Sequence, residues 1–149
     1  MKVSLRSTYG IMAAVDLAMQ AGGSPIQAKA IAKRQGIPAR FLEQVLHMMK
    51  KAGLVSSLRG AQGGYVLSKR PADLSVAEIL EALDGPFHPI NGSNGHRPVG
   101  RLSRTEGLLA GIWNRVSDAE RHVLEAITIE ELAGQQRQLE EQRSLMYHI

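Results

Sequence analysis

The segment QAKAIAKRQGIPARFLEQVLHMMKKAG, residues 27–53, contains two short amphipathic stretches separated by a tight turn. The first stretch has apolar and small residues at three- and four-residue spacing and is followed by Gly36, which predicts a helix over about residues 27–35. The second begins at Pro38, a residue suited to the first position of a helix, and ends at Gly53. Two helices joined by so short a turn predict a helix-turn-helix.

The second predicted helix has one apolar and one polar face. Its apolar side chains fall within an arc of about 140° and comprise Phe41, Leu42, Val45, Leu46, Met49 and Ala52. The opposite face carries side chains that can bind base edges or phosphates, namely Arg40, Glu43, Gln44, His47, Lys50 and Lys51. Arginine pairs with guanine, glutamine with adenine, and glutamate accepts a hydrogen bond from cytosine. The pattern predicts a recognition helix, although an ordinary amphipathic surface helix has the same spacing.

Two short apolar runs follow, at residues 54–58 and 65–68, and they predict a pair of strands joined by the glycine-rich loop RGAQGG. A strand–loop–strand unit after a helix-turn-helix is typical of a wing. The loop residues that can contact DNA are Arg59, Gly60, Gln62, Gly63 and Gly64, because glycines let the backbone approach a phosphate and arginine suits the narrow minor groove. A flexible hairpin turn is the alternative. A nucleotide-binding loop is rejected, since no Gly-Lys-Ser/Thr follows and the loop joins two strands.

Charge is divided unevenly along the chain. Residues 1–73 contain 11 Lys and Arg against 3 Asp and Glu, a net charge of +8, whereas residues 74–149 contain 7 against 11, a net charge of −4. A basic half suggests a polyanionic partner, and together with a helix-turn-helix it favours double-stranded DNA. An unevenly charged, solvated surface is the alternative.

The composition excludes several classes of protein. The chain has 149 residues, 44% of them hydrophobic and 4% aromatic, and no cysteine. We therefore expect a mostly aliphatic core and exclude disulfides, thiolate-bound zinc and cysteine-held iron–sulphur clusters. No apolar run is long enough to span a membrane, so we expect a cytoplasmic protein without membrane contact.

An N-terminal helix is predicted over about residues 8–21, because Ser7 or Thr8 can cap it and two glycines follow it. Its apolar residues recur at three- and four-residue spacing and give one apolar face, formed by Met12, Val15, Ala18 and Met19.

Three capping-box sequences predict helix starts in the second half of the chain: Ser75 with Glu78, Ser103 with Glu106, and Thr128 with Glu131. Residues 86–103 are rich in proline and glycine and predict an irregular loop. We expect a DNA-binding domain over residues 1–85, the loop over 86–103, and a C-terminal part over 104–149. That part contains a long helix, a short helix and a polar tail from Gln135 that frays.

The helix that begins near Ser103 is predicted to run to about residue 125. Its apolar residues form a stripe comprising Leu109, Ile112, Val116, Ala119 and Val123, with Trp113 beside it. Such a stripe belongs either to a core or to a dimer interface. Because palindromic DNA sites require two-fold partners, we expect a homodimer formed through this helix.

His88 and His96, in the predicted loop, are the candidate metal ligands. A protein metal site needs three or four converging ligands, so two histidines eight residues apart are weak evidence, and exposed histidines are the alternative. No spacing typical of a catalytic triad or a carboxylate pair stands out. We therefore predict no metal, no cofactor and no enzymatic activity.

The chain also resembles a known family. The matching motifs are Tyr9-Gly10, Ile31-Ala32 with Gly36-Ile37-Pro38, Phe41-Leu42-Glu43-Gln44, Gly53-Leu54-Val55-Ser56-Ser57, Arg59-Gly60 with Gly63-Gly64-Tyr65, the helix end at Ile79 to Gly85, Trp113, and Ile127-Thr128-Ile129. These motifs resemble the Rrf-two (Rrf2) family of bacterial winged-helix transcription regulators, over nearly the whole chain to about Ala133. The resemblance implies a dimer with a long crossing helix that binds operator DNA. It further implies that Glu43 and Gln44 read bases and that Arg59 enters the minor groove.

One departure from the family is large. Sensor members hold an iron–sulphur cluster with cysteines that lie in the interval matching residues 86–103, and here that interval has none. Other members lack a cluster and respond to a partner protein or to an unknown signal. We therefore predict a mainly α protein with a winged helix-turn-helix, a two-stranded wing and a long C-terminal dimerisation helix. Its predicted function is sequence-specific regulation, as a repressor, by a cluster-free homodimer on a palindromic operator, with a regulatory protein partner left open. The alternative is a winged-helix protein–protein adaptor.

Overall fold

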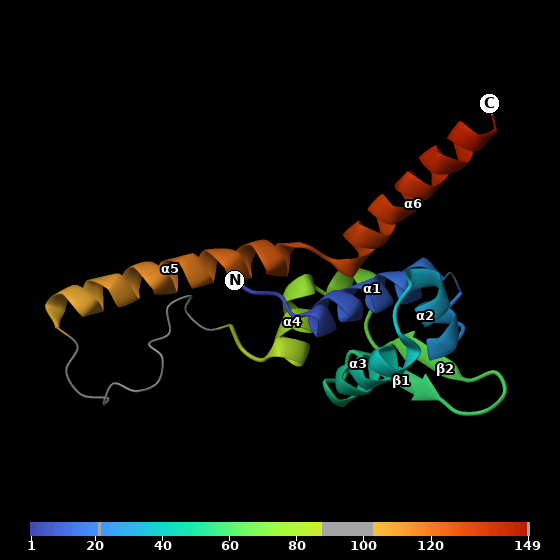
Figure 1. Ribbon diagram of the computed structural model, residues 1–149, viewed down its shortest axis with the longest axis horizontal. Coiled ribbons are helices and arrows are strands. Elements are labelled where there is room, and N and C mark those ends of the chain that lie inside the picture. Colours follow the sequence, from blue (N-terminus) through green and yellow to red (C-terminus); the bar gives the residue numbers. More distant parts are fainter. Residues whose placement is uncertain (21, 88–102, 149) are drawn as a thin grey trace.

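The computed structural model describes residues 1–20, 22–87 and 103–148 (Figure 1). In chain order the elements are α1 (Leu5–Met19), α2 (Ala28–Gln35), α3 (Ala39–Lys51), β1 (Val55–Leu58), β2 (Gly64–Leu67), the 3₁₀ turn η1 (Pro71–Asp73), α4 (Val76–Asp84), α5 (Arg104–Ala126) and α6 (Ile129–Tyr147). The predicted mainly α architecture, with a helix-turn-helix, a two-stranded wing and a long C-terminal helix, is confirmed.

The turn between α2 and α3 depends on one glycine. Gly36 has a φ of +67°, in the left-handed region that favours glycine, and its N–H donates to the carbonyl of Ala32. The N–H of Ile37 donates to the same carbonyl at 3.0 Å, and the Ile37 side chain is buried. Pro38 then precedes the first residue of α3. The chain thereby reverses within three residues and brings α3 against α2.

Helix α1 lies at the centre of the core and packs against α2, α3, α4 and α6 (Figure 1). Its fully buried apolar residues are Ala13 and Ala14, whereas Met12 and Val15 are only half-buried. Met12, Val15 and Ala18 of the predicted apolar face pack against the core, but the deepest positions belong to small residues that the prediction left out. Small residues occupy the contact because other helices approach closely: a Cβ on Gly10 would lie 2.4 Å from Cδ1 of Leu83.

Helix α1 also begins earlier than predicted. Ser4, rather than Ser7 or Thr8, is the N-cap residue, and its hydroxyl accepts a hydrogen bond from the N–H of Ser7 at 3.0 Å. Ser7 is fully buried, so its own hydroxyl needs a partner, which Asp84 provides.

The wing is an antiparallel pair in which Val55 lies opposite Leu67 and Leu58 lies opposite Gly64. Ile26 extends this pair, since it exchanges backbone hydrogen bonds of 2.9 and 2.8 Å with Tyr65. The Ile26 backbone passes so close to Gly64 that a Cβ there would lie 2.4 Å from the Ile26 carbonyl carbon. The base of the wing is thus attached to the segment before α2, a contact that the local sequence does not indicate.

The three predicted capping residues, Ser75, Ser103 and Thr128, are all N-caps, and Ser103 forms the full reciprocal box with Glu106. Helix α6 continues to Tyr147, so the predicted fraying from Gln135 is wrong. Glutamine, glutamate and arginine favour a helix, which is consistent with its continuation.

The C-terminal helices return to the core at one point. The N–H of Val76 donates to the carbonyl of Ile127 at 2.9 Å, and the N–H of Ile129 donates to the carbonyl of Leu74 at 2.8 Å. Ile129 is fully buried, and the Arg137 guanidinium donates to the carbonyl of Ala18 at 3.0 Å. Helix α6 is therefore anchored on α1, while α5 extends away from the DNA-binding half (Figure 1).

Candidate nucleic-acid interface

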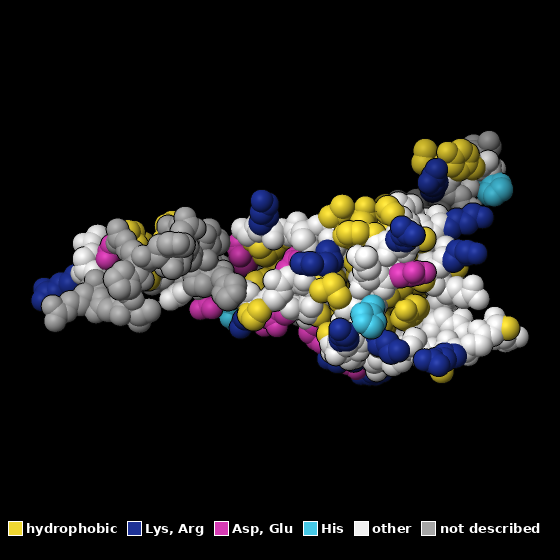
Figure 2. Space-filling view, turned by 60° about the horizontal axis from the view of Figure 1, so that its bottom comes forward, with side chains coloured by type: hydrophobic (Ala, Val, Ile, Leu, Met, Phe, Trp, Pro, Cys, Tyr) yellow, Lys and Arg dark blue, Asp and Glu magenta, His cyan; other side chains and the backbone are white. Residues whose placement is uncertain are grey.

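The polar face of α3 is open to solvent. All six side chains predicted to contact DNA are exposed: Arg40, Glu43, Gln44, His47, Lys50 and Lys51. Several Lys and Arg side chains gather over α3 and the wing in the space-filling view (Figure 2). A helix that offers such side chains on one face has the form needed to enter a major groove.

The opposite face of α3 is packed into the core, which holds the helix in place. Leu42, Val45, Leu46 and Met49 are buried, as predicted, whereas Ala52 is exposed. Phe41 is half-buried on α1. A rigid support of this kind fixes the backbone of α3 before binding, so that only its exposed side chains lose conformational entropy on DNA.

A buried carboxylate fixes the end of α2 beside the turn. Asp16 in α1, whose side chain is 2% exposed, accepts hydrogen bonds from Arg34 Nε at 3.0 Å and Arg34 Nη2 at 2.7 Å. Gln35 Nε2 donates to the same carboxylate at 3.0 Å. The hydrogen bond to Asp16 raises the pKa of Arg34 above its usual value, although burial acts in the opposite direction. Sequence reasoning missed this site, because no local pattern connects α1 with the end of α2.

The structure separates the residues of the wing loop into two groups. Arg59, Gly60 and Gln62 are exposed. Gly63 is buried, and its N–H donates to the carbonyl of Gly60 at 3.0 Å. A Cβ on Gly63 would lie 2.2 Å from the Leu58 carbonyl oxygen, so glycine is needed there to close the loop. Gly63 and Gly64 therefore shape the wing whether or not they contact DNA.

The apolar stripe of α5 is uncovered in the part of the chain that the structure describes. Leu109 is 45% exposed, Ile112 47% and Val123 61%, while Trp113 is half-buried. The remaining stripe residues, Val116 and Ala119, are also exposed and line a shallow hollow with Ile112 and Arg115. The stripe is thus not part of this chain's own described core.

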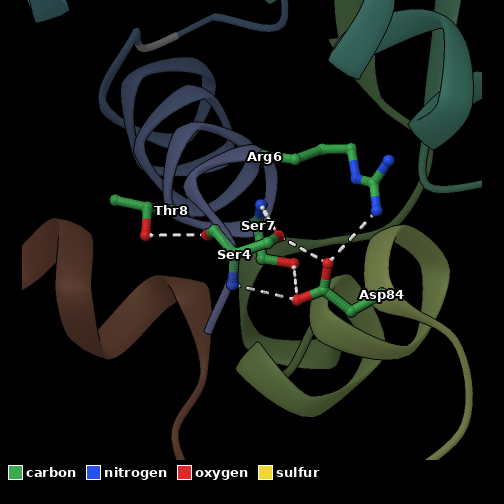
Figure 3. A network of polar contacts seen from close by, with 5 residues as sticks. All are labelled: Ser4, Arg6, Ser7, Thr8 and Asp84. Carbon is green, nitrogen blue, oxygen red and sulfur yellow. Dashed lines mark hydrogen bonds and ion pairs between the residues drawn. The ribbon is translucent and has the colours of Figure 1, made fainter. Parts of the chain in front are cut away.

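A polar network joins the start of α1 to the end of α4 (Figure 3). The Asp84 carboxylate accepts hydrogen bonds from the Ser4 N–H at 3.3 Å, from the Ser4 hydroxyl, and from the Ser7 hydroxyl at 2.7 Å. Arg6 Nη2 lies 3.6 Å from Asp84 Oδ1. Burial alone would raise the pKa of Asp84, but these hydrogen bonds and the nearby arginine hold it below its usual value. No sequence motif marked this network.

Metal ligands do not converge in residues 1–20, 22–87 and 103–148, where no group of three His, Cys, Asp or Glu side chains could hold an ion. The two histidines singled out from the sequence, His88 and His96, lie outside these ranges. Among the described helices, none is long and apolar enough to cross a membrane.

Helix α3 packs on the core with its polar face exposed, and the β1–β2 hairpin that follows it carries the exposed Arg59. This arrangement defines a winged helix-turn-helix protein. The chain belongs to the Rrf2 family: residues 3–135 match the family model described as "Iron-dependent Transcriptional regulator". It is 34% identical over 134 residues to the HTH-type transcriptional regulator CymR of Bacillus subtilis (strain 168), covering 90% of this chain and 91% of the relative.

Solved structures agree with this assignment. The structure of CymR, described as the global cysteine regulator of B. subtilis, superposes with a TM-score of 0.74 at 34% identity, covering 90% of this chain and 97% of that one. The structure of T. potens IscR gives a TM-score of 0.72 at 35% identity, covering 91% and 88%. The protein is therefore a DNA-binding transcriptional regulator and belongs to a family of regulators rather than enzymes.

The family description names iron, but the residues of this chain do not fit a cysteine-held iron–sulphur cluster. The sequence contains no cysteine, so no thiolate can hold an iron–sulphur cluster. This chain therefore regulates transcription without a cysteine-held cluster.

Proposed function

We propose that the protein acts as a homodimer on a palindromic operator, with residues 1–85 contacting DNA and residues 104–149 providing the dimer contact. The observation that carries this proposal is the stripe of α5, whose leucine, isoleucine and valine side chains remain 36–61% exposed to solvent in the described chain. Exposed apolar stripes on long helices are costly in water and mark interfaces. A two-fold pairing through α5 would bury the stripe and present two copies of α3 to one duplex.

On each half-site the exposed face of α3 would read the major groove. Glu43 and Gln44 are the proposed base-reading residues, and Arg40, Lys50 and Lys51 would contact bases or phosphates. Arg59, at the exposed tip of the wing, would enter the adjacent minor groove.

We infer that such a dimer represses transcription by occupying its operator, which requires no further domain. Because bacterial DNA is transcribed in the cytoplasm, we expect the protein to act there. A regulatory protein partner would supply a signal that a cluster supplies in other members. DNA binding through Lys and Arg releases counterions, so its affinity falls steeply as the salt concentration rises. A protein–protein adaptor, the alternative function, would show little such dependence.

Selection of bound duplexes from a random pool, with and without cell extract, tests the proposal. We expect enrichment of an inverted repeat, an affinity that falls steeply with salt concentration, and a dimeric mass in solution. Ile112→Glu should give monomers that lose operator affinity, whereas Asn114→Ala, exposed on the opposite side of the same helix, should preserve the dimer. No enrichment and no salt dependence would favour the adaptor, and enrichment only with extract would indicate an obligatory partner.

A further inference from the structure

We propose that Asp84 is a positioning residue for DNA binding, because its carboxylate closes a junction of three helices that sets the angle between the helix-turn-helix and α5. The inference rests on the dimeric function proposed above. It goes beyond that function by naming what determines the separation of the two recognition helices.

The first side of the junction joins α1 to α4. Asp84 is the last residue of α4, and its carboxylate accepts hydrogen bonds from Ser4 and Ser7 (Figure 3). Ser7 is fully buried, so Asp84 is tied to a part of α1 that the core holds in place. Helix α1 in turn packs directly on α3. The end of α4 therefore has a fixed position relative to the recognition helix.

Two ion pairs join α4 and the segment before α1 to α5. Arg121 Nη2 lies 3.3 Å from Glu81 Oε1, one turn before Asp84 in α4. The amino group of Met1, three residues before Ser4, lies 3.4 Å from Glu120 Oε1. Glu120 and Arg121 of α5 thus form ion pairs with the N-terminal segment and with α4, respectively. These are the two parts of the chain that Asp84 joins.

Among the described residues, apolar side chains leave part of this junction open. A hollow of about 560 Å³ opens there, lined by Val3, Leu80, Asp84, Phe87 and Glu120 among others. Where side chains are not closely packed, shape alone does not determine how two helices lie against one another. The polar contacts around Asp84 therefore set the geometry.

A small change at the junction would be amplified along α5. The helix is anchored at its C-terminal end by the hydrogen bonds of Ile127 and Ile129, and its other end lies about 26 Å beyond Arg121. A tilt of about 5° would move that end by about 2 Å, more than half of the 3.4 Å rise of one base pair. Loosening the junction should therefore relax the required spacing between half-sites.

The test uses the full chain and duplexes that the wild-type protein selects from a random pool. These duplexes are resynthesised with the half-site spacing shortened or lengthened by one base pair, and affinities are measured at fixed salt. We expect Asp84→Asn to reduce the preference for the selected spacing by roughly three- to tenfold, a size typical of mutations along a coupling network. Affinity for a duplex with one half-site should remain unchanged.

Two further variants make the result specific. Arg121→Gln opens another side of the same junction, so it should flatten the spacing preference as Asp84→Asn does, and the double variant should lose little more. Asp73→Asn removes an exposed ion pair with Arg70, 2.8 Å long and outside the junction, and should keep the wild-type profile. Circular dichroism and urea unfolding establish that each variant is folded.

An unchanged spacing preference in folded Asp84→Asn and Arg121→Gln proteins would overturn the inference. Equal loss of affinity at every spacing, including the single half-site, would also overturn it and indicate a purely structural role. A wild-type protein without any spacing preference would instead contradict the proposed two-fold operator, and the inference with it.

Discussion

The rings of Tyr9 in α1 and Phe41 in α3 meet edge to face, with centroids 5.4 Å apart and planes at 81°. Phe41 lies in the first turn of α3, next to Arg40 and two residues before Glu43. The contact therefore holds the end of the recognition helix that enters the groove first in helix-turn-helix proteins.

This aromatic pair should contribute a coupling energy of about 1 kcal/mol to stability. The double-mutant cycle of Tyr9→Leu and Phe41→Leu, followed by urea unfolding, measures it. Leucine keeps the apolar character of each site and removes only the ring contact. Strictly additive losses would show that the two rings do not interact in solution.

Gln44→Ala should reduce discrimination at one base pair of the operator by about 1–3 kcal/mol and leave affinity for random DNA nearly intact. The reason is that an exposed amide on α3 can form a bidentate contact with adenine but adds no charge. Competition binding against operators substituted at each position measures the effect. Equal weakening on specific and random DNA would show that Gln44 does not read a base.

Arg59→Ala should weaken binding most on operators with an A·T-rich, narrow minor groove beneath the wing. Removing the guanidinium eliminates a charge that such a groove attracts strongly. Affinities on duplexes with A·T or G·C pairs in the flanks, compared between wild type and variant, provide the measurement. Ala61→Ser, in the same exposed loop, serves as the matched control. A ratio of affinities that does not change with groove width would contradict the wing assignment.

Stability near neutral pH should include a contribution of about 1 kcal/mol from the ionised Asp84. Because the folded-state pKa of Asp84 is lowered, this contribution is present above the unfolded pKa and is lost as the pH falls through the folded pKa. Asp84→Asn should therefore be less stable than wild type at pH 7, and the difference should shrink as the pH falls through the lowered folded-state pKa of Asp84. Urea unfolding from pH 7 to pH 2.5 tests this, and a difference that persists at low pH would contradict it.

Local sequence patterns predicted the elements well, because the decisive signals lie within a few residues. Gly36 followed by Pro38 defines the turn, and Ser75, Ser103 and Thr128 define helix starts through contacts to residues three positions away. The polar and apolar faces of α3 follow from spacing alone. The assignment of DNA contacts on that face and on the wing remains a prediction.

The contacts that position the site could not be predicted in this way, because they join residues far apart in the chain. Asp16 pairs with Arg34, Asp84 with Ser4 and Ser7, and neither pairing has a local sequence signal. The deepest positions of α1 escaped prediction for a related reason. Hydrophobic spacing favours large side chains, whereas a helix that packs against four others requires small ones, such as Gly10 and Ala14, at its closest contacts.

Ile129 and Ala133 are buried beside residues from the first half of the chain, and Ile129 is part of the same core as α1 and α3. During synthesis, a nascent chain that has reached residue 85 thus lacks part of the core that its recognition helix needs. At bacterial translation rates, the missing residues emerge about 2 to 9 s later, after the whole of α5 has been made. The newly made regulator would therefore complete its DNA-reading surface only once the helix proposed to pair it with a second copy has already left the ribosome.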